Sequence, residues 1–245
     1  MNLLLLERGE LDHDGRVTLR DARAAHLVRV LKVVPGARVR AGIVEGAIGS
    51  AEVERVEGET VTLCCAIEGE PPPRPRVDLL LALPRPKVLG RLYAPIAQLG
   101  VARLMLTNAA KVERYYFDAH QLEPAQRRAQ LLEGLSQARD TRVPEVTVHR
   151  SFRALVEDEL DAACGDALRL LADPGDHPSP RARCEELARE QRVLVAIGPE
   201  GGWNDFEREL LVEHRFLPIS MGPRTLRTDV ACIALLALVH DAVGG

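Results

Sequence analysis

The sequence predicts a mixed α/β protein of two domains, a small β-rich domain followed by a larger domain built on a parallel sheet. Four of the nine residues 68–76 (EGEPPPRPR) are prolines, which favour an extended and stiff connector. Short alternating or β-branched stretches precede this connector, whereas strand patterns that alternate with helix patterns follow it. We therefore expect one domain over residues 1–69 and a second over residues 70–245.

The first domain is expected to be a small β-barrel with one helix. Glycine-rich turns separate its strand patterns, which lie at residues 17–19, 38–41, 49–56 and 60–67. A helical pattern at residues 20–31 interrupts these strands. Its apolar residues fall on one face of a helix: Ala24, Leu27, Val28 and Leu31.

The second domain is expected to contain a parallel sheet covered by helices on both faces, because its strand patterns are continuously apolar. The expected strands are at residues 77–83, 101–107, 146–149, 167–172, 193–197 and 216–221. The expected helices are at residues 87–98, 122–138, 153–163, 181–190 and 228–243, with a further helix that Asn204 caps and Glu207 supports from the capping-box position.

Composition excludes several classes of protein. The longest apolar run, residues 230–239, is about half of the roughly 20 residues that span a bilayer, so we expect no membrane partner. The five cysteines form no CxxC pair, and we therefore expect no metal site and no disulfide framework. Unpaired thiols indicate a reducing, cytoplasmic location. The net charge of −4 argues against a uniformly basic nucleic-acid binder.

One candidate binding loop is residues 197–203 (IGPEGGW), which follow an apolar strand and precede a capped helix. Ligands of open α/β sheets bind beyond the carboxyl ends of the strands, and glycines let the backbone approach a ligand closely. The loop lacks both the Gly-Lys-Ser/Thr of a phosphate-binding Walker loop and the GxGxxG pattern. An ordinary strand-to-helix turn is the alternative interpretation.

A second candidate loop is residues 221–229 (MGPRTLRTD), which also lie between an apolar strand and a helix. Thr228 and Asp229 have a simple structural explanation, as helix cap and first-turn acid. Arg224 and Arg227 do not, because the positive end of the helix dipole disfavours cations. The two arginines therefore indicate an anionic or carbonyl-rich ligand.

Both loops, with several shorter segments in the same order, resemble the RsmE family of the SPOUT superfamily, the bacterial small-subunit (16S) ribosomal RNA uridine-N3 methyltransferases. The shorter segments are HLVRVLK at residues 26–32 followed by Pro35-Gly36, QLGV at 98–101, Glu113-Arg114, and RVPE at 142–145. The resemblance extends over nearly the whole chain.

The resemblance implies a PUA-like β-barrel that binds RNA, a SPOUT domain whose parallel sheet is tied in a trefoil knot, and a homodimer. It also implies S-adenosyl-L-methionine (SAM) as cofactor, held mainly by backbone groups of the knot loops. The corresponding positions here are Leu171, Ala172, Asp173, Ile197, Gly198, Pro199, Glu200, Gly201, Gly202, Ile219, Met221, Gly222, Arg224 and Leu226. The implied substrate is small-subunit ribosomal RNA, free or in an assembled subunit.

Methylation of uridine N3 removes a proton that lies between two carbonyl groups, so the site needs an aligned methyl donor, a proton acceptor and hydrogen-bond donors for the carbonyls. Arg227 is the first candidate donor, followed by Arg114 and Arg142. Asp229 or Glu200 is the candidate base, and water is the alternative to both.

RNA contacts are expected in the first domain. Six basic residues and one acidic residue lie between positions 20 and 40, and the candidates among them are Arg20, Arg23, Arg29 and Lys32. Residues 1–76 contain no Phe, Tyr or Trp, so base stacking is expected from Tyr115, Tyr116 or Trp203.

Two alternatives stay open. Pro95, Gln98, Asp140 and Asp229 depart from the residues common in the family. They motivate a SPOUT methyltransferase for a different RNA position, or a catalytically silent RNA-binding or ribosome-assembly factor on the same scaffold. A hydrolase is disfavoured, since neither HExxH nor GxSxG occurs.

Overall fold

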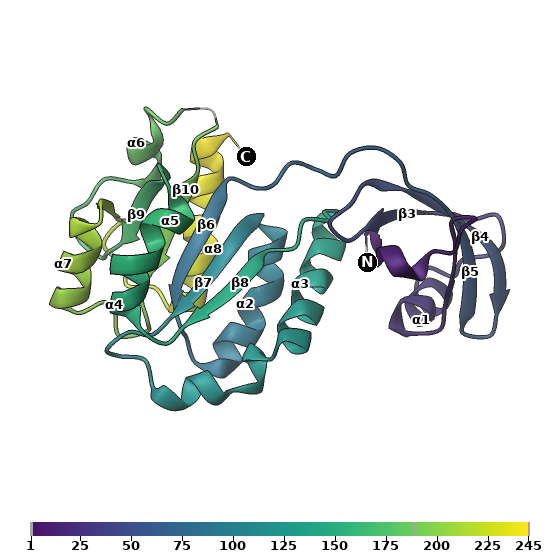
Figure 1. Ribbon diagram of the computed structural model, residues 1–245, viewed down its shortest axis with the longest axis horizontal. Helices are drawn as coiled ribbons and strands as arrows, with labels where there is room; N and C mark the ends of the chain where they lie inside the picture. Colours follow the sequence, from purple (N-terminus) through teal and green to yellow (C-terminus); the bar gives the residue numbers. More distant parts are fainter. Residues whose placement is uncertain (1, 189, 245) are drawn as a thin grey trace. The chain divides into compact units, whose positions relative to one another are not determined.

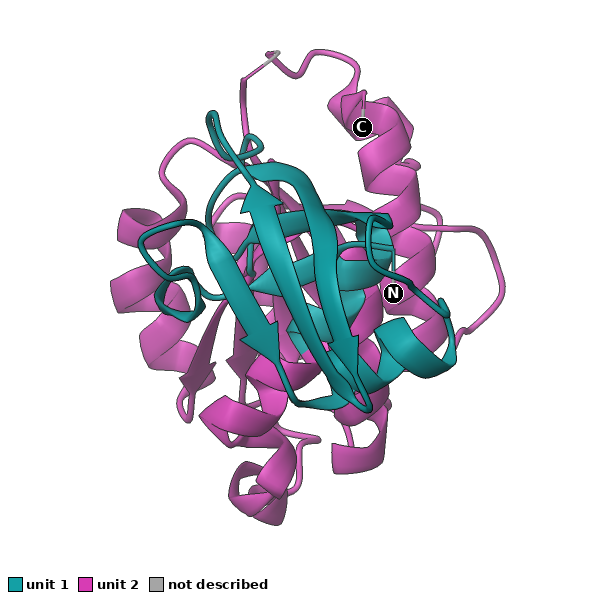
Figure 2. Cartoon of the chain, turned by 90° about the vertical axis from the view of Figure 1, so that its right-hand side faces the viewer, with its two compact units in different colours: residues 1–74, 131–143 teal, residues 75–130, 144–245 magenta. Residues whose placement is uncertain are grey.

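The computed structural model describes residues 2–188 and 190–244, and the chain folds into two compact units (Figure 2). Unit 1 contains the chain up to residue 74 together with residues 131–143, and unit 2 contains residues 75–130 and the chain from residue 144 onward. Each unit therefore includes two stretches of sequence. The expected junction at residues 69 and 70 lies inside the proline-rich segment that leads to unit 2.

Unit 1 is built on a five-stranded sheet with the order β1-β3-β4-β5-β2. β1 (Leu4–Leu6) runs parallel to β3 (Arg38–Ile43), and the remaining neighbours, β3 with β4 (Ile48–Glu57), β4 with β5 (Thr60–Ala66) and β5 with β2 (Arg16–Leu19), are antiparallel. β1 and β2 end this order, so the ladders of the described residues form an open sheet where the sequence led us to expect a barrel. β1 was missed because three consecutive buried leucines show no alternation.

The first helix of unit 1 is shorter than its apolar pattern predicted. α1 (Ala22–Arg29) follows the short 3-10 turn η1 (Arg8–Glu10) and strand β2, and Asp21 caps it by accepting a hydrogen bond from the Arg23 amide at 2.9 Å. Leu27 is fully buried against the sheet. Leu31, which we expected on the same face, lies beyond the helix and is 45% exposed.

The second stretch of unit 1, residues 131–143, is bound to the first by backbone hydrogen bonds. The amides of Asn2 and Leu3 donate to the Ser136 carbonyl at 3.1 and 3.0 Å. The buried Thr141 hydroxyl donates to the Gly46 carbonyl at 2.6 Å. Residues 131–138 are the second half of α3 (Pro124–Ala138), so this helix begins in unit 2 and ends in unit 1.

Unit 2 is built on a six-stranded sheet with the order β11-β9-β10-β6-β7-β8, and every neighbouring pair is parallel. The strands are β6 (Val77–Ala82), β7 (Val101–Thr107), β8 (Glu145–His149), β9 (Leu168–Ala172), β10 (Val193–Ile197) and β11 (Phe216–Ile219). All residues of β6 and β10 are buried. The prediction of a parallel sheet is confirmed.

Helices lie over both faces of this sheet (Figure 1). They are α2 (Pro86–Gln98), the first half of α3, the continuous stretch α4 (Phe152–Ala154), η4 (Leu155–Glu159) and α5 (Leu160–Cys164), then α6 (Pro180–Cys184), α7 (Asp205–Glu213) and α8 (Thr228–Val243), with the 3-10 turns η2 (Arg114–Asp118) and η3 (His120–Leu122). α6 ends at Cys184, so the prediction of a helix over residues 181–190 is wrong for residues 185–188 and 190, and its residue 189 lies outside the described residues. No described helix is both long and apolar enough to cross a lipid bilayer.

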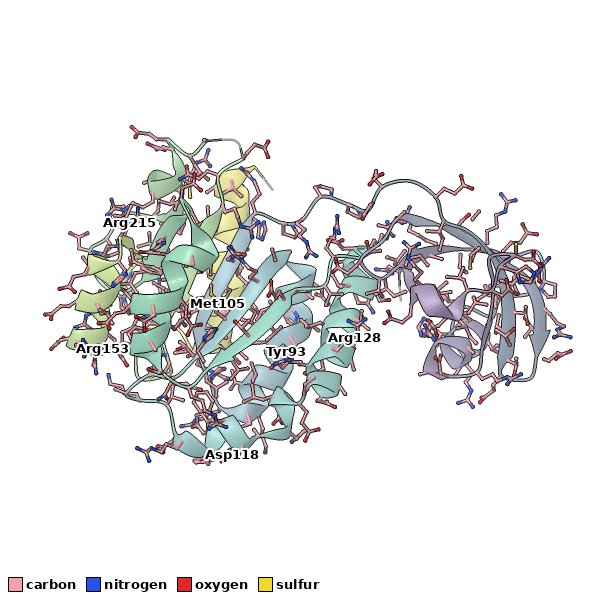
Figure 3. All side chains as sticks on the ribbon, in the orientation of Figure 1. Tyr93, Met105, Asp118, Arg128, Arg153 and Arg215 are labelled. Carbon is pink, nitrogen blue, oxygen red and sulfur yellow. The ribbon has the colours of Figure 1, made fainter. Side chains whose placement is uncertain are left out.

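The interior of unit 2 includes one buried ion cluster at the beginning of the central strands. Asp78 is completely buried in β6, and it accepts hydrogen bonds from the guanidinium groups of Arg103 and Arg192. A buried carboxylate requires such partners, because removal from water costs several kcal/mol per ion. Tyr93 and Met105 are also buried in unit 2, whereas Arg153 and Arg215 extend outward (Figure 3).

Candidate cofactor cavity and charged rim

A cavity of about 130 Å³ opens where β9, β10 and β11 end. Strands of a parallel sheet end at the same edge, so the loops that follow them meet there. Twelve of the fourteen predicted cofactor residues line this cavity: Ala172, Asp173, Ile197, Gly198, Pro199, Glu200, Gly202, Ile219, Met221, Gly222, Arg224 and Leu226. The other two do not, since Leu171 is buried within β9 and Gly201 lies on the outer side of its loop, in contact with Lys111.

The loop after β10 is a tight turn that ends in a helix cap. The Gly202 amide donates to the Pro199 carbonyl at 2.8 Å, and Gly202 adopts φ +69°, which favours glycine. Asn204 then caps α7, and Glu207 completes the capping box. Both features of the cap were predicted from the sequence. These hydrogen bonds set the course of the loop's backbone along the cavity wall.

The loop after β11 also depends on a glycine. Gly222 adopts φ +100°, and its amide donates to the Ser220 hydroxyl at 3.1 Å. The Asp173 amide donates to the Ile219 carbonyl at 3.1 Å, which joins the ends of β9 and β11. Most residues that line the cavity are apolar or glycine, and Arg224 is the basic residue on its lining.

A charged cluster stands beside the cavity at the start of α8. Asp229 accepts hydrogen bonds on one carboxylate oxygen from Arg227 at 2.8 Å and from Arg91 at 3.0 Å. The Asp229 side chain is 18% exposed, whereas the Arg227 side chain is 71% exposed. Two guanidinium groups on one carboxylate oxygen compete with its use as a proton acceptor, and they leave Asp229 well placed to orient Arg227.

Glu200, the other candidate base, is also engaged by the backbone. Its carboxylate accepts a hydrogen bond from the Arg85 amide at 3.1 Å, so it connects the loop after β10 to the beginning of α2. This contact indicates that the Glu200 carboxylate helps to shape the loop. Glu200 remains exposed and still lines the cavity.

The remaining two arginines in the candidate catalytic set have different environments. Arg114 begins η2 in unit 2 and is exposed. Arg142 belongs to unit 1, where its Nε donates to the Pro72 carbonyl at 2.6 Å and its Nη1 lies 3.3 Å from Glu45. Its side chain is 18% exposed, so Arg142 is already occupied in holding the end of unit 1 together.

The comparisons with known proteins agree with this geometry. Residues 70–240 match the family model described as the RNA methyltransferase domain. The Ribosomal RNA small subunit methyltransferase E of Treponema pallidum (strain Nichols) is 32% identical over 243 residues, which cover 98% of this chain and 90% of that protein. This chain belongs to the ribosomal RNA small subunit methyltransferase E family.

Solved structures of similar proteins show the same fold over the full length. A ribosomal RNA small subunit methyltransferase E from Neisseria gonorrhoeae, bound to SAM, has a TM-score of 0.77 at 18% identity and covers 98% of this chain and 97% of its own. A methyltransferase from Legionella pneumophila, in complex with SAM, has a TM-score of 0.73 at 23% identity with the same coverage. At these identities the likeness establishes the fold.

Some site residues of this family member were not predicted. The additional cavity-lining residues are Pro174, Trp203, Ser220, Thr225, Thr228, Ala231 and Leu235. Ala231 and Leu235 follow Thr228 at the i+3 and i+7 positions, so the three lie on one face of α8 and helical spacing would have identified them. No comparable signal pointed to Arg91, which meets Asp229 only in the folded chain.

Two of the three aromatic residues that we expected to stack on RNA bases are buried. Trp203 is 3% exposed and its ring packs on Phe152, with centroids 5.3 Å apart. Tyr116 is 7% exposed and contacts Tyr115 edge to face. Burial leaves little of either ring for a nucleotide base, so the structure disfavours Trp203 and Tyr116 for stacking. Tyr115, at 64% exposure, is the remaining candidate of the three.

The predicted RNA-contacting residues of unit 1 divide into two pairs. Arg23 donates to the Leu5 carbonyl at 2.9 Å and pairs with Glu10 and Asp21, and these carboxylates raise the pKa of its guanidinium. Arg29 pairs with Glu59. Arg20 and Lys32 are exposed and no ion pair involves either of them within the described chain. Arg23 is therefore a structural residue of the sheet edge.

Proposed function

We propose that this protein transfers the methyl group of SAM to N3 of a uridine in small-subunit ribosomal RNA. The observation that carries the proposal is the convergence of three strand-end loops on one cavity beside a charged cluster. Family membership supports the reaction and the substrate class. Because ribosomes are assembled in the cytoplasm, we place its role in ribosomal RNA processing there.

The cavity residues fit the cofactor. Ile197, Ile219 and Leu226 offer apolar walls for an adenine ring, and the glycine-containing loops expose backbone groups for its nitrogens. The absence of a Walker sequence agrees with a ligand that has no phosphate. The Trp203 indole Nε1 is buried without a partner among the described residues, which leaves a donor in the wall of the site. Bound there, SAM supplies an electrophilic methyl group on a sulfonium.

The protein's own contribution is to position the uridine and to neutralise its carbonyl oxygens. Loss of the N3 proton places negative charge on O2 and O4, and Arg227 is the exposed guanidinium that Asp229 aims from the start of α8. With Asp229 and Glu200 both bound to donors, we assign the proton to water. The N3–C bond forms as the S–C bond breaks.

The exposed side of α8 indicates how two copies of this chain could associate. α8 buries Cys232, Leu235, Leu236 and Val239 on one side and exposes Val230, Ile233 and Leu238 on the opposite side. An exposed apolar stripe on a helix favours association, and we propose that two copies of this chain form a homodimer through it.

We also propose that the loops around the cavity form a trefoil knot, and that unit 1 is a PUA-like domain that holds RNA through Arg20 and Lys32.

A catalytically silent RNA-binding factor is the second candidate. Pro95 occupies the interior of α2, and Asp229 is engaged by two arginines. This candidate predicts RNA binding without methyl transfer.

Calorimetric titration with S-adenosylhomocysteine (SAH), the product of SAM use, tests the cofactor site first. We expect saturable micromolar binding together with a change in the fluorescence of Trp203, the single tryptophan of the chain. Absence of binding at millimolar SAH, with or without ribosomal RNA, would contradict the proposal.

A further inference from the structure

Two loops at the carboxyl edge of the unit 2 sheet are tied together outside the cavity. The Lys111 ammonium donates to the Gly201 carbonyl at 2.6 Å, which joins the segment after β7 to the loop after β10. Gly201 makes this contact possible, because a Cβ there would lie 2.6 Å from the Lys111 Cδ. The loop that lines the cofactor cavity therefore rests directly on a lysine from another strand end.

A buried carboxylate forms a second tie between the same two loops. Glu207 is 3% exposed, and one of its oxygens accepts from the Asn204 amide at 2.9 Å within the helix cap. Its other oxygen accepts from the Ala110 amide at 2.6 Å. The helix cap thus reaches beyond its own helix and fixes the residue that precedes Lys111.

The segment held in this way continues directly to Arg114, a candidate donor to the uridine carbonyls, and to Tyr115, the remaining candidate for base stacking. Arg114 and Tyr115 follow Lys111 within four residues, and both are exposed. Tyr116 and Phe117 are buried and anchor η2, whereas Asp118 at its end lies at the surface (Figure 3). A shift of the cofactor loop would therefore be passed through Lys111 to the start of η2.

The geometry points to Lys111 as a positioning residue that couples the two substrates, so that an occupied cofactor cavity strengthens RNA binding through Arg114 and Tyr115. This inference rests on the proposed function. Lys111 donates to a carbonyl of the cofactor loop, and that hydrogen bond has its full strength only while the loop holds one conformation. A ligand that orders the loop consequently orders η2, and the coupling is reciprocal.

The test measures the affinity for in vitro transcribed, unmethylated small-subunit ribosomal RNA with and without saturating SAH. For the native protein we expect SAH to tighten RNA binding at least about fivefold, the lower end of typical allosteric coupling. Lys111→Met, which keeps the Glu207 tie, should lower this ratio toward one. Lys111→Arg, which still donates to the Gly201 carbonyl, should restore most of it.

Lys87→Met is the matched control, because Lys87 is an exposed lysine in the first turn of α2 and loses the same charge. It should keep the native ratio, even if RNA binding weakens in both variants. An equal ratio in the native protein and Lys111→Met, or no effect of SAH on RNA affinity in the native protein, would overturn the inference. Failure of the native protein to bind SAH at all would instead overturn the proposed function.

Discussion

At the scale of single residues, the loops that we propose hold the cofactor depend on backbone conformations that side chains disfavour. Gly222 adopts φ +100° in the turn after β11, and its amide is held by the Ser220 hydroxyl. No atom beyond its neighbours lies within 4 Å of a Cβ at this position, so added bulk has space. A side chain at this position would instead strain the backbone, because side chains disfavour a positive φ, at a cost of about 1–3 kcal/mol.

We therefore predict that Gly222→Ala weakens SAH binding about tenfold, which corresponds to roughly 1.4 kcal/mol. Isothermal titration calorimetry measures the change. Gly9→Ala is the control, because Gly9 also has free space but does not adopt a positive φ. Unchanged affinity in Gly222→Ala would show that this turn does not shape the cofactor site.

Asp229 also acts at this scale, by holding Arg227 and Arg91 on one carboxylate oxygen. We predict that Asp229→Ala lowers kcat by roughly 100-fold, because a misplaced positioning group costs about that factor, while the Kd for SAH stays within about twofold. Asp241→Ala, an exposed aspartate of the same helix, should leave both values unchanged.

The pH dependence of kcat distinguishes positioning from base catalysis at Asp229. If Asp229 only positions Arg227, the pH profile of kcat in Asp229→Ala should keep the native shape at its lower level. Loss of the limb that reports an essential base would instead identify Asp229 as the proton acceptor.

At the scale of elements, α8 combines a site at its first turn, an apolar stripe along its length and a histidine near its end. Burial lowers the pKa of His240 below its usual value, with the Gly100 backbone opposing this shift and Arg76 adding to it. The His240 Nε2 is buried without a hydrogen-bond partner in the described chain. The folded protein consequently favours the neutral ring.

A depressed histidine pKa means that the unfolded chain binds the proton first as the pH falls. The stability that His240 contributes is thus present above pH 6.5 and is lost as the pH falls through its folded pKa. We predict that urea unfolding shows a declining free energy from pH 6.5 to pH 5, and that His240→Leu flattens this decline. His13→Leu, at a 90% exposed histidine, should keep the native slope.

Elements were predictable where one local pattern dominated. The apolar strands of unit 2 and the cap at Asn204 were readable, because each depends on neighbours in sequence. The partners of Arg23, Arg29 and Asp229 were not, since Glu10, Glu59 and Arg91 approach only through the fold. A charge count over residues 20–40 could not detect carboxylates that lie outside that window.

At the scale of the whole molecule, the chain folds into two units, and α8 of unit 2 exposes an apolar face. Residues 131–143 return to unit 1 through hydrogen bonds that no linear boundary in the sequence revealed. The proposed cofactor cavity lies within unit 2, and its lining comes from three strand ends and α8. The proposed dimer face is the opposite side of that same helix.

We predict that Ile233→Asp converts the protein from dimer to monomer in sedimentation experiments, because a carboxylate would replace an exposed apolar side chain in the stripe. Val212→Asp places the same charge at an exposed valine of α7 and should remain dimeric. A native protein that sediments as a monomer at all concentrations would rule the dimer out.

The central claim is tested most directly by nucleoside mass spectrometry. Purified protein is incubated with unmethylated small ribosomal subunits, or with their free RNA, and with SAM carrying an isotopically labelled methyl group. We predict one labelled N3-methyluridine per small-subunit RNA. Label in a different nucleoside, or no label in a protein that binds SAH, would contradict the proposed reaction.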